Sequence, residues 1–342
     1  MSQMLNIRSR AMKRMRSTWN RSRRFVRTKI GGLHLDLNAN YENSVLIAGS
    51  GRGGTTWLAE IINYKHRYRF IFEPFFYERV GICGNFAWRQ YLRPETHDPK
   101  YLIPASLVFS GKVRSDWTDA YNRRFLCSQR LVKDVRCNLM LKWISAHFPA
   151  MPIVLLLRHP CAVAASRLQQ GWDDGYRDLF NQSQLVQDYL EPFSTAMHAA
   201  KSPFERHIFL WCIENYVPLK QLCRGDALVM FYEDLCVRPE TELDRLSCYL
   251  GVTFGEGVRQ ALTRPSSQTR KASSINRKGA DVASSWQDQV SRDMTTHALQ
   301  ILQLFGLGSV YSEGPMPLVE ADNLLGNGEF SEPVAPRWEA MS

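Results

Sequence analysis

A glycine-rich segment, Gly49-Ser-Gly-Arg-Gly-Gly-Thr-Thr-Trp57, lies between an apolar run and a helical pattern. Glycines let a backbone approach an anion closely, and the free N–H groups at the start of a helix point toward it. Arg52 adds a fixed cation, and Thr55 and Thr56 add hydroxyl donors. The residue types therefore predict a cradle for an anion such as phosphate. The alternative is a tight turn that serves only packing.

The spacing of the glycines leaves the ligand open. Gly49-x-Gly51-x-x-Gly54 matches the dinucleotide-binding fingerprint, and Glu73 stands 19 residues beyond Gly54, so an NAD(P)-dependent oxidoreductase is one alternative. Two features argue against this alternative: the segment has an arginine at its centre, and Thr-Thr-Trp stands at the helix entry. A Walker ATP-binding loop is excluded, because no Gly-Lys-Ser or Gly-Lys-Thr follows the glycines.

A second pattern that could hold phosphate lies farther along the chain. The apolar run 153–157 is followed by Arg158, a turn with Pro160, and a helical segment that carries Ser166. An arginine makes a forked, charge-assisted contact with phosphate, and a serine can donate its hydroxyl from the following helix. The alternatives are an Arg158–carboxylate pair and a packing role for Ser166.

Together the two patterns resemble those of sulfotransferases that take their sulfuryl group from 3′-phosphoadenosine 5′-phosphosulfate (PAPS). The segment Arg52-Gly53-Gly54-Thr55-Thr56-Trp57 resembles the 5′-phosphosulfate loop of that family, although Gly53 stands where serine is common. Arg158 and Ser166 resemble the family's 3′-phosphate element. The resemblance spans roughly residues 44–305. It implies a P-loop-NTPase-like fold, PAPS as co-substrate and no metal.

Further motifs of the family match other parts of the chain. Phe231-Tyr-Glu-Asp-Leu235 resembles the segment whose tyrosine contacts the adenine, and Trp57 matches the aromatic residue that stacks on it; packing is the alternative for both rings. Residues 277–279 resemble the loop that closes over the 3′-phosphate, with a solvated loop as the alternative. The resemblance thus implies the following donor-binding residues: Arg52, Gly53, Gly54, Thr55, Thr56, Trp57, Arg158, Ser166, Tyr232, Arg277, Lys278 and Gly279.

Sulfuryl transfer needs an acceptor hydroxyl in line with the breaking sulfur–oxygen bond, cations over the transferred group, and a base. We expect Arg52 to neutralise the leaving phosphate and Lys133 to assist it. The segment around Lys133 lacks the histidine of cytosolic phenol and steroid sulfotransferases. Glu73-Pro-Phe-Phe instead resembles the Glu-Pro-aromatic segment of the carbohydrate-type and bacterial enzymes. This resemblance implies that Glu73 is the base and that the acceptor is a carbohydrate or glycolipid hydroxyl. The alternatives are that Asp134 acts as the base instead, or that Glu73 has only a structural role.

Short apolar, β-branched runs predict the strands that position these residues. Because their hydrophobicity is continuous, we expect both faces to be covered, as in a parallel sheet. The predicted strands are residues 44–48, 68–72, 130–133, 153–157 and 227–231. The predicted helices are residues 55–66, 138–148, 161–170, 204–223 with an interruption near Pro218, and 239–250. The alternation predicts an α/β fold of three layers, α/β/α, around a central parallel sheet of about five strands.

The domain prediction is a basic extension over residues 1–38, one sulfotransferase domain over 39–312, and a loose tail over 313–342, which holds four prolines and six acidic residues. Residues 75–128 resemble an insertion that shapes the acceptor pocket. Their aromatic and basic side chains suit sugar stacking and anionic-glycan contacts, or internal packing: Trp88, Arg89, Tyr91, Trp117, Tyr121, Arg123 and Arg124.

The net charge of +10 lies on the N-terminal arm. Since ten of the 43 basic side chains fall in residues 1–35 with no acidic one, the remainder balances 33 basic against 33 acidic side chains. The arm could attach to an anionic membrane surface or a polyanionic acceptor, and nucleic acid is not expected. A non-catalytic module that binds polyanions or membranes through this arm is the second functional alternative. A solvated extension or an organelle-targeting peptide are the other interpretations of the arm itself.

The eight cysteines show no C-x-x-C pair or zinc spacing, and several lie in apolar surroundings typical of buried thiols. The sequence holds neither an apolar run long enough to span a membrane nor a secretory signal pattern. These features predict a cytoplasmic protein that attaches, if at all, to a membrane surface. They predict no oligomeric state.

Overall fold

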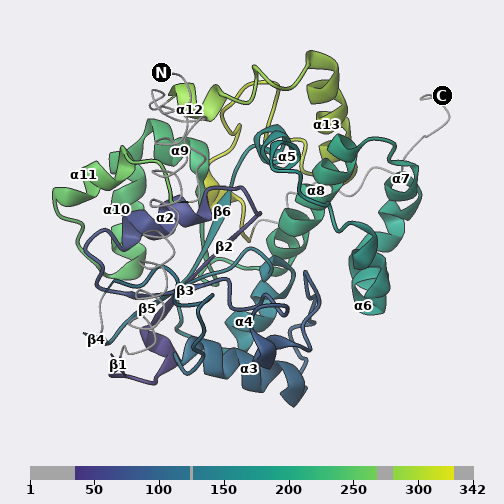
Figure 1. Ribbon diagram of the computed structural model, residues 1–342. Coiled ribbons are helices and arrows are strands. Elements are labelled where there is room, and N and C mark those ends of the chain that lie inside the picture. Colours follow the sequence, from purple (N-terminus) through teal and green to yellow (C-terminus); the bar gives the residue numbers. More distant parts are fainter. Residues whose placement is uncertain (1–34, 124–125, 268–279, 327–342) are drawn as a thin grey trace, which may run out of the picture.

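A sheet of five parallel strands forms the centre of the molecule (Figure 1). The computed structural model describes residues 35–123, 126–267 and 280–326. The strands follow the order β3-β5-β2-β6-β7. They are β2 (Ser44–Gly49), β3 (Arg69–Phe72), β5 (Arg130–Lys133), β6 (Ile153–Leu157) and β7 (Leu228–Phe231). The predicted parallel sheet is confirmed, and no strand bound differs from its prediction by more than one residue.

Both faces of the sheet are buried, because successive strand residues enter two different hydrophobic clusters. In β2, Leu46 and Ala48 belong to one cluster, and Val45 and Ile47 belong to the other. Helices on one face are α2 (Thr55–Ile62), α10 (Pro239–Leu250) and α11 (Gly257–Leu262). Helices on the other are α3 (Pro99–Phe109), α4 (Leu141–His147), α5 (Pro160–Gln169), α8 (Pro203–Gln221) and α13 (Arg292–Leu304). The predicted three-layer α/β/α fold is thus confirmed.

The strand order places the predicted site residues that follow the five strands at one edge of the sheet. From β2 the chain runs to the edge strand β3, returns to β5 beside β2, and then crosses to β6 and β7 on the other side of β2. In such sheets ligands bind outside the carboxyl ends of the strands, where the order reverses. The carboxyl ends of β2, β3, β5, β6 and β7 are followed by the glycine-rich segment, Glu73, Asp134, Arg158 and Tyr232.

Helix α8 continues through Pro218, so the predicted interruption there is wrong. A proline inside a helix leaves the carbonyl four residues earlier without its backbone partner. Here that carbonyl belongs to Glu214, and it accepts a hydrogen bond from Asn138 Nδ2 at 2.9 Å. A side chain from another part of the fold therefore replaces the missing N–H group.

The domain bounds also differ from the prediction. Asp36, in β1 (Leu35–Asp36), forms an ion pair with Arg130 at the amino edge of the sheet, so the folded part begins before residue 39. Residues 313–326 are not a loose tail, because Ala321, Leu324 and Leu325 are buried in the core. The predicted insertion, residues 75–128, contains α3 and buries apolar side chains in the same core. The basic arm lies outside the described residues, apart from its last residue, Leu35.

All eight cysteines fall in the described residues as free thiols, and five of them are buried, as expected. Among the helices of the described ranges, none is both long and apolar enough to cross a membrane.

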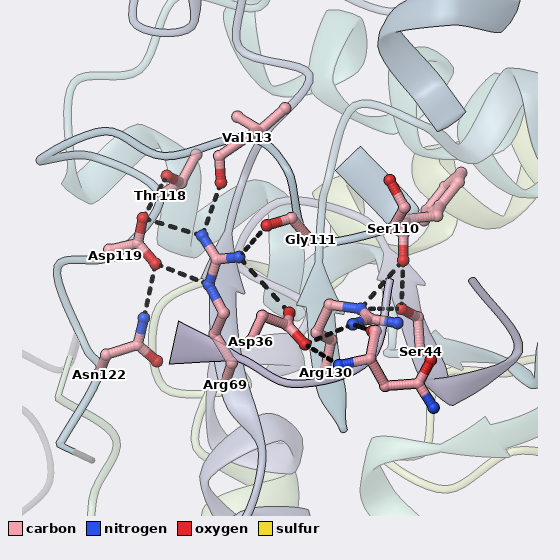
Figure 2. Close-up of polar contacts among 12 residues, drawn as sticks. Asp36, Ser44, Arg69, Ser110, Gly111, Val113, Thr118, Asp119, Asn122 and Arg130 are labelled. Atoms are coloured by element: carbon pink, nitrogen blue, oxygen red, sulfur yellow. Dashed lines mark hydrogen bonds and ion pairs between the residues drawn. The ribbon is translucent and has the colours of Figure 1, made fainter. Parts of the chain in front are cut away.

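Two buried arginines join the amino ends of β3 and β5 to the surrounding loops (Figure 2). Arg69 Nε donates to Asp119 Oδ1 at 3.0 Å, and Arg69 Nη2 donates to the Val113 carbonyl at 2.6 Å. Arg130 Nη1 donates to Asp36 Oδ1 at 2.8 Å, and its Nε donates to Ser44 Oγ at 2.8 Å. This network lies at the edge opposite the predicted site, so its role is to hold the fold together.

Replacing Arg130 with methionine is expected to lower the free energy of unfolding by about 3 kcal/mol, because removing one partner of a buried ion pair leaves the other charge uncompensated. The measurement is urea denaturation followed by circular dichroism. Arg93, which pairs with Asp188 while 31% of its side chain is exposed, provides the control. Its methionine variant is expected to lose less than about 1 kcal/mol. Equal losses in both variants would contradict a special role for the buried network.

Candidate active site

The glycine-rich segment forms a loop between β2 and α2. The Gly49 N–H donates to Asn138 Oδ1 at 3.1 Å, which fixes the start of the loop. Gly54 is the N-cap of α2, with φ of 95° in the left-handed region, and no side chain caps the helix there. The N–H groups of the first helical turn are therefore available to an anion, as in other phosphate-binding loops. We call residues 49–57 the donor loop.

Aromatic side chains pack directly against this loop. A Cβ atom on Gly54 would lie 2.5 Å from Cδ2 of Tyr232, so only glycine allows the ring to come this close. The rings of Tyr232 and Trp57 lie 5.3 Å apart between centroids. Tyr232 is buried, whereas Trp57 is partly exposed. Tyr232 thus supports the loop, and of the two rings Trp57 has more surface available to a ligand.

The two predicted phosphate elements meet in the structure. Arg52 Nε donates to Ser166 Oγ at 3.0 Å, and Arg158 Nη1 donates to the Arg52 carbonyl at 3.1 Å. The guanidinium of Arg158 lies 4.3 Å above the Tyr232 ring. Its Nε is buried and has no hydrogen-bond partner among the described residues. Arg52, predicted for the leaving phosphate, therefore points toward the residue predicted for the 3′-phosphate, and both belong to one cationic site.

Buried side chains fix the chain next to Arg158, at His159. The Glu233 carboxylate accepts hydrogen bonds from the His159 N–H at 2.8 Å and from the Tyr311 hydroxyl at 3.1 Å. Burial raises the pKa of Glu233 to about 7 and lowers the pKa of His159 to about 4, so the imidazole is neutral at physiological pH. The His159 ring stacks on Trp286 with centroids 4.1 Å apart. These contacts fix the backbone next to Arg158. Because the His159 imidazole is neutral, it adds no positive charge to the phosphate site.

Glu73 forms the centre of a second charged cluster. Its Oε1 accepts a hydrogen bond from Lys133 Nζ at 2.6 Å, and its Oε2 accepts one from Arg136 Nη1 at 2.6 Å. The Glu73 backbone adopts φ of 42°, unusual for a residue with a side chain, and its N–H donates to the Lys133 carbonyl at 2.7 Å. Burial alone would raise the pKa of Glu73, but the two cations outweigh it and hold the pKa below its ordinary value. The carboxylate is therefore ionised at neutral pH.

Asp134, the predicted substitute base, has a different environment. Its Oδ2 accepts from the Phe75 N–H at 2.9 Å, and its Oδ1 accepts from the Arg136 N–H at 2.7 Å. Burial, together with the nearby Glu73, raises its pKa to about 6. Because the side chain is fully buried and both oxygens are engaged, Asp134 fixes the turn that presents Glu73.

Partly exposed aromatic rings surround the Glu73 cluster. The Arg136 guanidinium lies 4.1 Å from the Phe76 ring and 4.3 Å from the Trp88 ring. The Trp117 indole donates from Nε1 to the Glu73 carbonyl at 3.1 Å and packs edge-on to Phe76. We call Phe76, Trp88 and Trp117 the aromatic wall. Two of its three members come from the sequence-predicted acceptor residues.

Sequence reasoning missed the ion pairs beneath the donor loop. Arg167 Nε donates to the Gly51 carbonyl at 3.0 Å, and its Nη2 donates to Glu214 Oε2 at 2.7 Å. The other Glu214 oxygen accepts from Arg89 Nε at 2.6 Å. A signal was available, because Glu214 interrupts an apolar run in α8, and a buried carboxylate requires cationic partners. The sequence places Arg136 in the segment Lys133-Asp-Val-Arg136 but gave it no role, because its partner Glu73 lies 63 residues away.

The structure brings together most of the predicted site. Glu73 and Lys133 are in contact, and so are Arg52, Ser166 and Arg158 beside the donor loop. The segment Arg277-Lys278-Gly279 lies outside the described residues.

Residues 44–256 match the model of the sulfotransferase family. No curated protein sequence matches the chain significantly.

Several solved structures are similar over most of their length. The sulfotransferase domain from the curacin biosynthetic pathway is 15% identical, with a TM-score of 0.40 over 79% of this chain and 97% of that one. The sulfotransferase domain of the Synechococcus PCC 7002 olefin synthase is 16% identical, with a TM-score of 0.44 over 77% and 94%. Mouse sulfotransferase SULT7A1, complexed with PAP, is 13% identical, with a TM-score of 0.43 over 84% and 91%.

Proposed function

The chain belongs to the sulfotransferase family, and we propose that it transfers a sulfuryl group from PAPS to a carbohydrate or glycoconjugate hydroxyl. Family membership makes the chain an enzyme of sulfuryl transfer and excludes the oxidoreductase alternative. One observation supports PAPS as the donor. The donor loop and the Arg158–Ser166 element are joined through Arg52, so two anion sites adjoin as a nucleotide with two separate phosphate groups requires.

In this proposal the two elements divide the donor between them. The N–H groups of the first turn of α2, with Thr55 and Thr56, bind the 5′-phosphosulfate. Arg158 and Ser166 bind the 3′-phosphate, and the unpartnered Nε of Arg158 supplies one donor. Trp57 stacks on the adenine with its exposed ring face. Arg52 exchanges its hydrogen bond to Ser166 for contacts with the bound phosphates.

Transfer proceeds by in-line displacement. The acceptor oxygen forms a bond to sulfur while the bond between sulfur and the bridging phosphate oxygen breaks, and the hydroxyl proton passes to Glu73. The leaving group is 3′-phosphoadenosine 5′-phosphate (PAP). Once Glu73 is protonated, it no longer neutralises Lys133 and Arg136. Their charge then stabilises the negative charge that develops on the leaving phosphate. Glu73 thereby links proton removal to charge stabilisation.

The carbohydrate acceptor is supported by the aromatic wall beside Glu73. Phe76, Trp88 and Trp117 are all partly exposed, and Arg136 lies against two of these rings. Aromatic rings bind the apolar faces of sugars, and a nearby guanidinium adds hydrogen-bond donors. The resemblance of Glu73-Pro-Phe-Phe to the carbohydrate-type segment supports the same acceptor class.

A screen with labelled PAPS tests the proposal. Purified protein is incubated with the donor and separate panels of glycans, glycolipids, phenols and steroids, and labelled product is counted. We expect transfer to at least one sugar hydroxyl and a rise in melting temperature with PAP but not with NAD. Transfer confined to phenols or steroids would overturn the acceptor assignment, whereas a missing response to PAP would overturn the donor assignment.

A further inference from the structure

Helix α5, which carries Ser166 and Arg167, ends in a defined cap. Gly171 adopts φ of 63°, its N–H donates to the Leu168 carbonyl at 3.0 Å, and the Trp172 N–H donates to the Arg167 carbonyl at 3.1 Å. This pair of hydrogen bonds is the glycine-capped helix end that fixes the direction of the next residue. Trp172 is therefore placed by the same helix that supports the phosphate site.

The Trp172 ring lies directly on the donor loop. A Cβ atom on Gly51 would lie 2.8 Å from Cζ3 of Trp172 and 3.8 Å from Cγ2 of Val135. Any side chain at position 51 would thus collide with the indole. Arg167 holds the carbonyl of the same glycine from beneath. Gly51 is consequently fixed by hydrogen bonding on one side and covered by an aromatic ring on another.

The indole is also open to solvent. Trp172 is 41% exposed, and among the described residues it is the only tryptophan with such a large exposed fraction. Single exposed apolar side chains are common on protein surfaces, so it is the contact of this ring with Gly51 of the donor loop that distinguishes Trp172. Val135, which lies near Gly51 as Trp172 does, stands in the sequence between Asp134 and the Arg136 that binds Glu73. Trp172 and the segment that carries Arg136 therefore both adjoin the donor loop at Gly51.

The loop after Trp172 returns toward the aromatic wall. A Cβ atom on Gly175 would lie 3.4 Å from Arg89 Nη1 and 3.6 Å from Trp88 Cδ1. Residues 172–175 thus reach from the donor loop to Trp88. The exposed indole and the aromatic wall border the same region, where an acceptor hydroxyl must approach both the donor and Glu73.

We propose that Trp172 is an acceptor-binding residue whose exposed indole face stacks on the apolar face of the acceptor's sugar ring. This inference rests on the proposed function and adds a second aromatic surface to it, from outside the insertion. Trp172 orients the ring so that its hydroxyl points toward the donor loop with Glu73 behind it. The residue thereby sets acceptor specificity and leaves donor binding to the phosphate elements.

The test compares Trp172→Ala, Trp172→Phe and Leu168→Ala with the unaltered enzyme. Leu168 is 37% exposed at the end of the same helix and serves as the matched control. We expect Trp172→Ala to raise the KM for a sugar acceptor about tenfold, as loss of one stacked ring predicts. The affinity for PAP should stay within about twofold, and Trp172→Phe should restore most of the acceptor affinity. Leu168→Ala should match the unaltered enzyme.

Acceptor binding is measured in parallel by isothermal titration with PAP present, so the result depends neither on turnover nor on the signal of the replaced tryptophan. An unchanged acceptor affinity in Trp172→Ala would overturn the inference. An equal loss of PAP and acceptor affinity would also overturn it, because Trp172 would then only support the donor loop. Failure of the proposed function looks different, since the unaltered enzyme itself would then bind no PAP or no sugar.

Discussion

Replacing Glu73 with glutamine is expected to lower kcat about 100- to 1,000-fold, the usual contribution of a positioned general base. Glutamine has nearly the same shape but cannot accept the hydroxyl proton at a useful rate. Lys133 and Arg136 would lose the charge that both now contact at 2.6 Å. The measurement is steady-state transfer from labelled PAPS, with acceptor and donor KM determined separately.

Two controls separate a catalytic role from a structural one. PAP affinity and the melting temperature of the variant show whether the fold and the donor site survive the loss of the buried ion pairs. Lys133→Met removes one cation but keeps the base, and it should lower kcat less than the loss of Glu73 does. Near-full turnover by Glu73→Gln would show that another group takes the proton.

The pH dependence follows from the same environment. The pKa of Glu73 is held below its ordinary value of 4.5, so the carboxylate stays ionised as the pH falls through that value. Its ion pairs stabilise the folded enzyme above the unfolded pKa, and this contribution is lost only as the pH falls through the lower folded pKa. The low pKa also makes Glu73 a weak base, which is consistent with proton transfer late in the displacement, when the acceptor hydroxyl has become acidic.

Replacing Arg158 with alanine is expected to weaken PAP binding about 30- to 100-fold, equivalent to about 2–3 kcal/mol for lost charged hydrogen bonds. The guanidinium is already fixed over Tyr232 and by its contact with the Arg52 carbonyl. Little side-chain entropy is therefore lost when phosphate binds. Isothermal titration with PAP measures the effect, and raising the ionic strength should reduce it only slightly, because salt screens partly buried charges less than exposed ones.

Arg259 offers a matched control for this variant. It lies on α11 with 70% of its side chain exposed and pairs with Glu240 at 3.1 Å. Arg259→Ala should leave PAP affinity unchanged, whereas Arg158→Lys should retain charge but lose the forked geometry and give an intermediate loss. Unchanged PAP affinity in Arg158→Ala would remove the second phosphate site from the proposal.

The sequence was most informative where chemistry and secondary structure are local. The apolar runs located the strands, because a strand buried on both faces must be apolar at every position. The site motifs follow strand ends, and parallel strands carry their carboxyl ends to one edge. The meeting of the donor loop with Arg158 was therefore foreseeable, once the strands were recognised. The continuity of α8 through Pro218 was not foreseeable, because the Asn138 amide that replaces the missing N–H group comes from a distant turn.

The sequence by itself pointed to the family, because the donor loop and the Arg158–Ser166 pattern each place phosphate-binding residue types at close sequence positions, and the family model agrees. Only the tertiary structure decided which groups surround the reacting centre. Glu73 meets Arg136 across 63 residues, Arg52 meets Ser166 across 114, and Trp172 covers Gly51 from the far end of another helix. Hydrophobic periodicity records which face of an element is buried, but it does not record which partner faces it. The charge balance at Glu73 and the ring beside the donor loop are therefore properties of the fold.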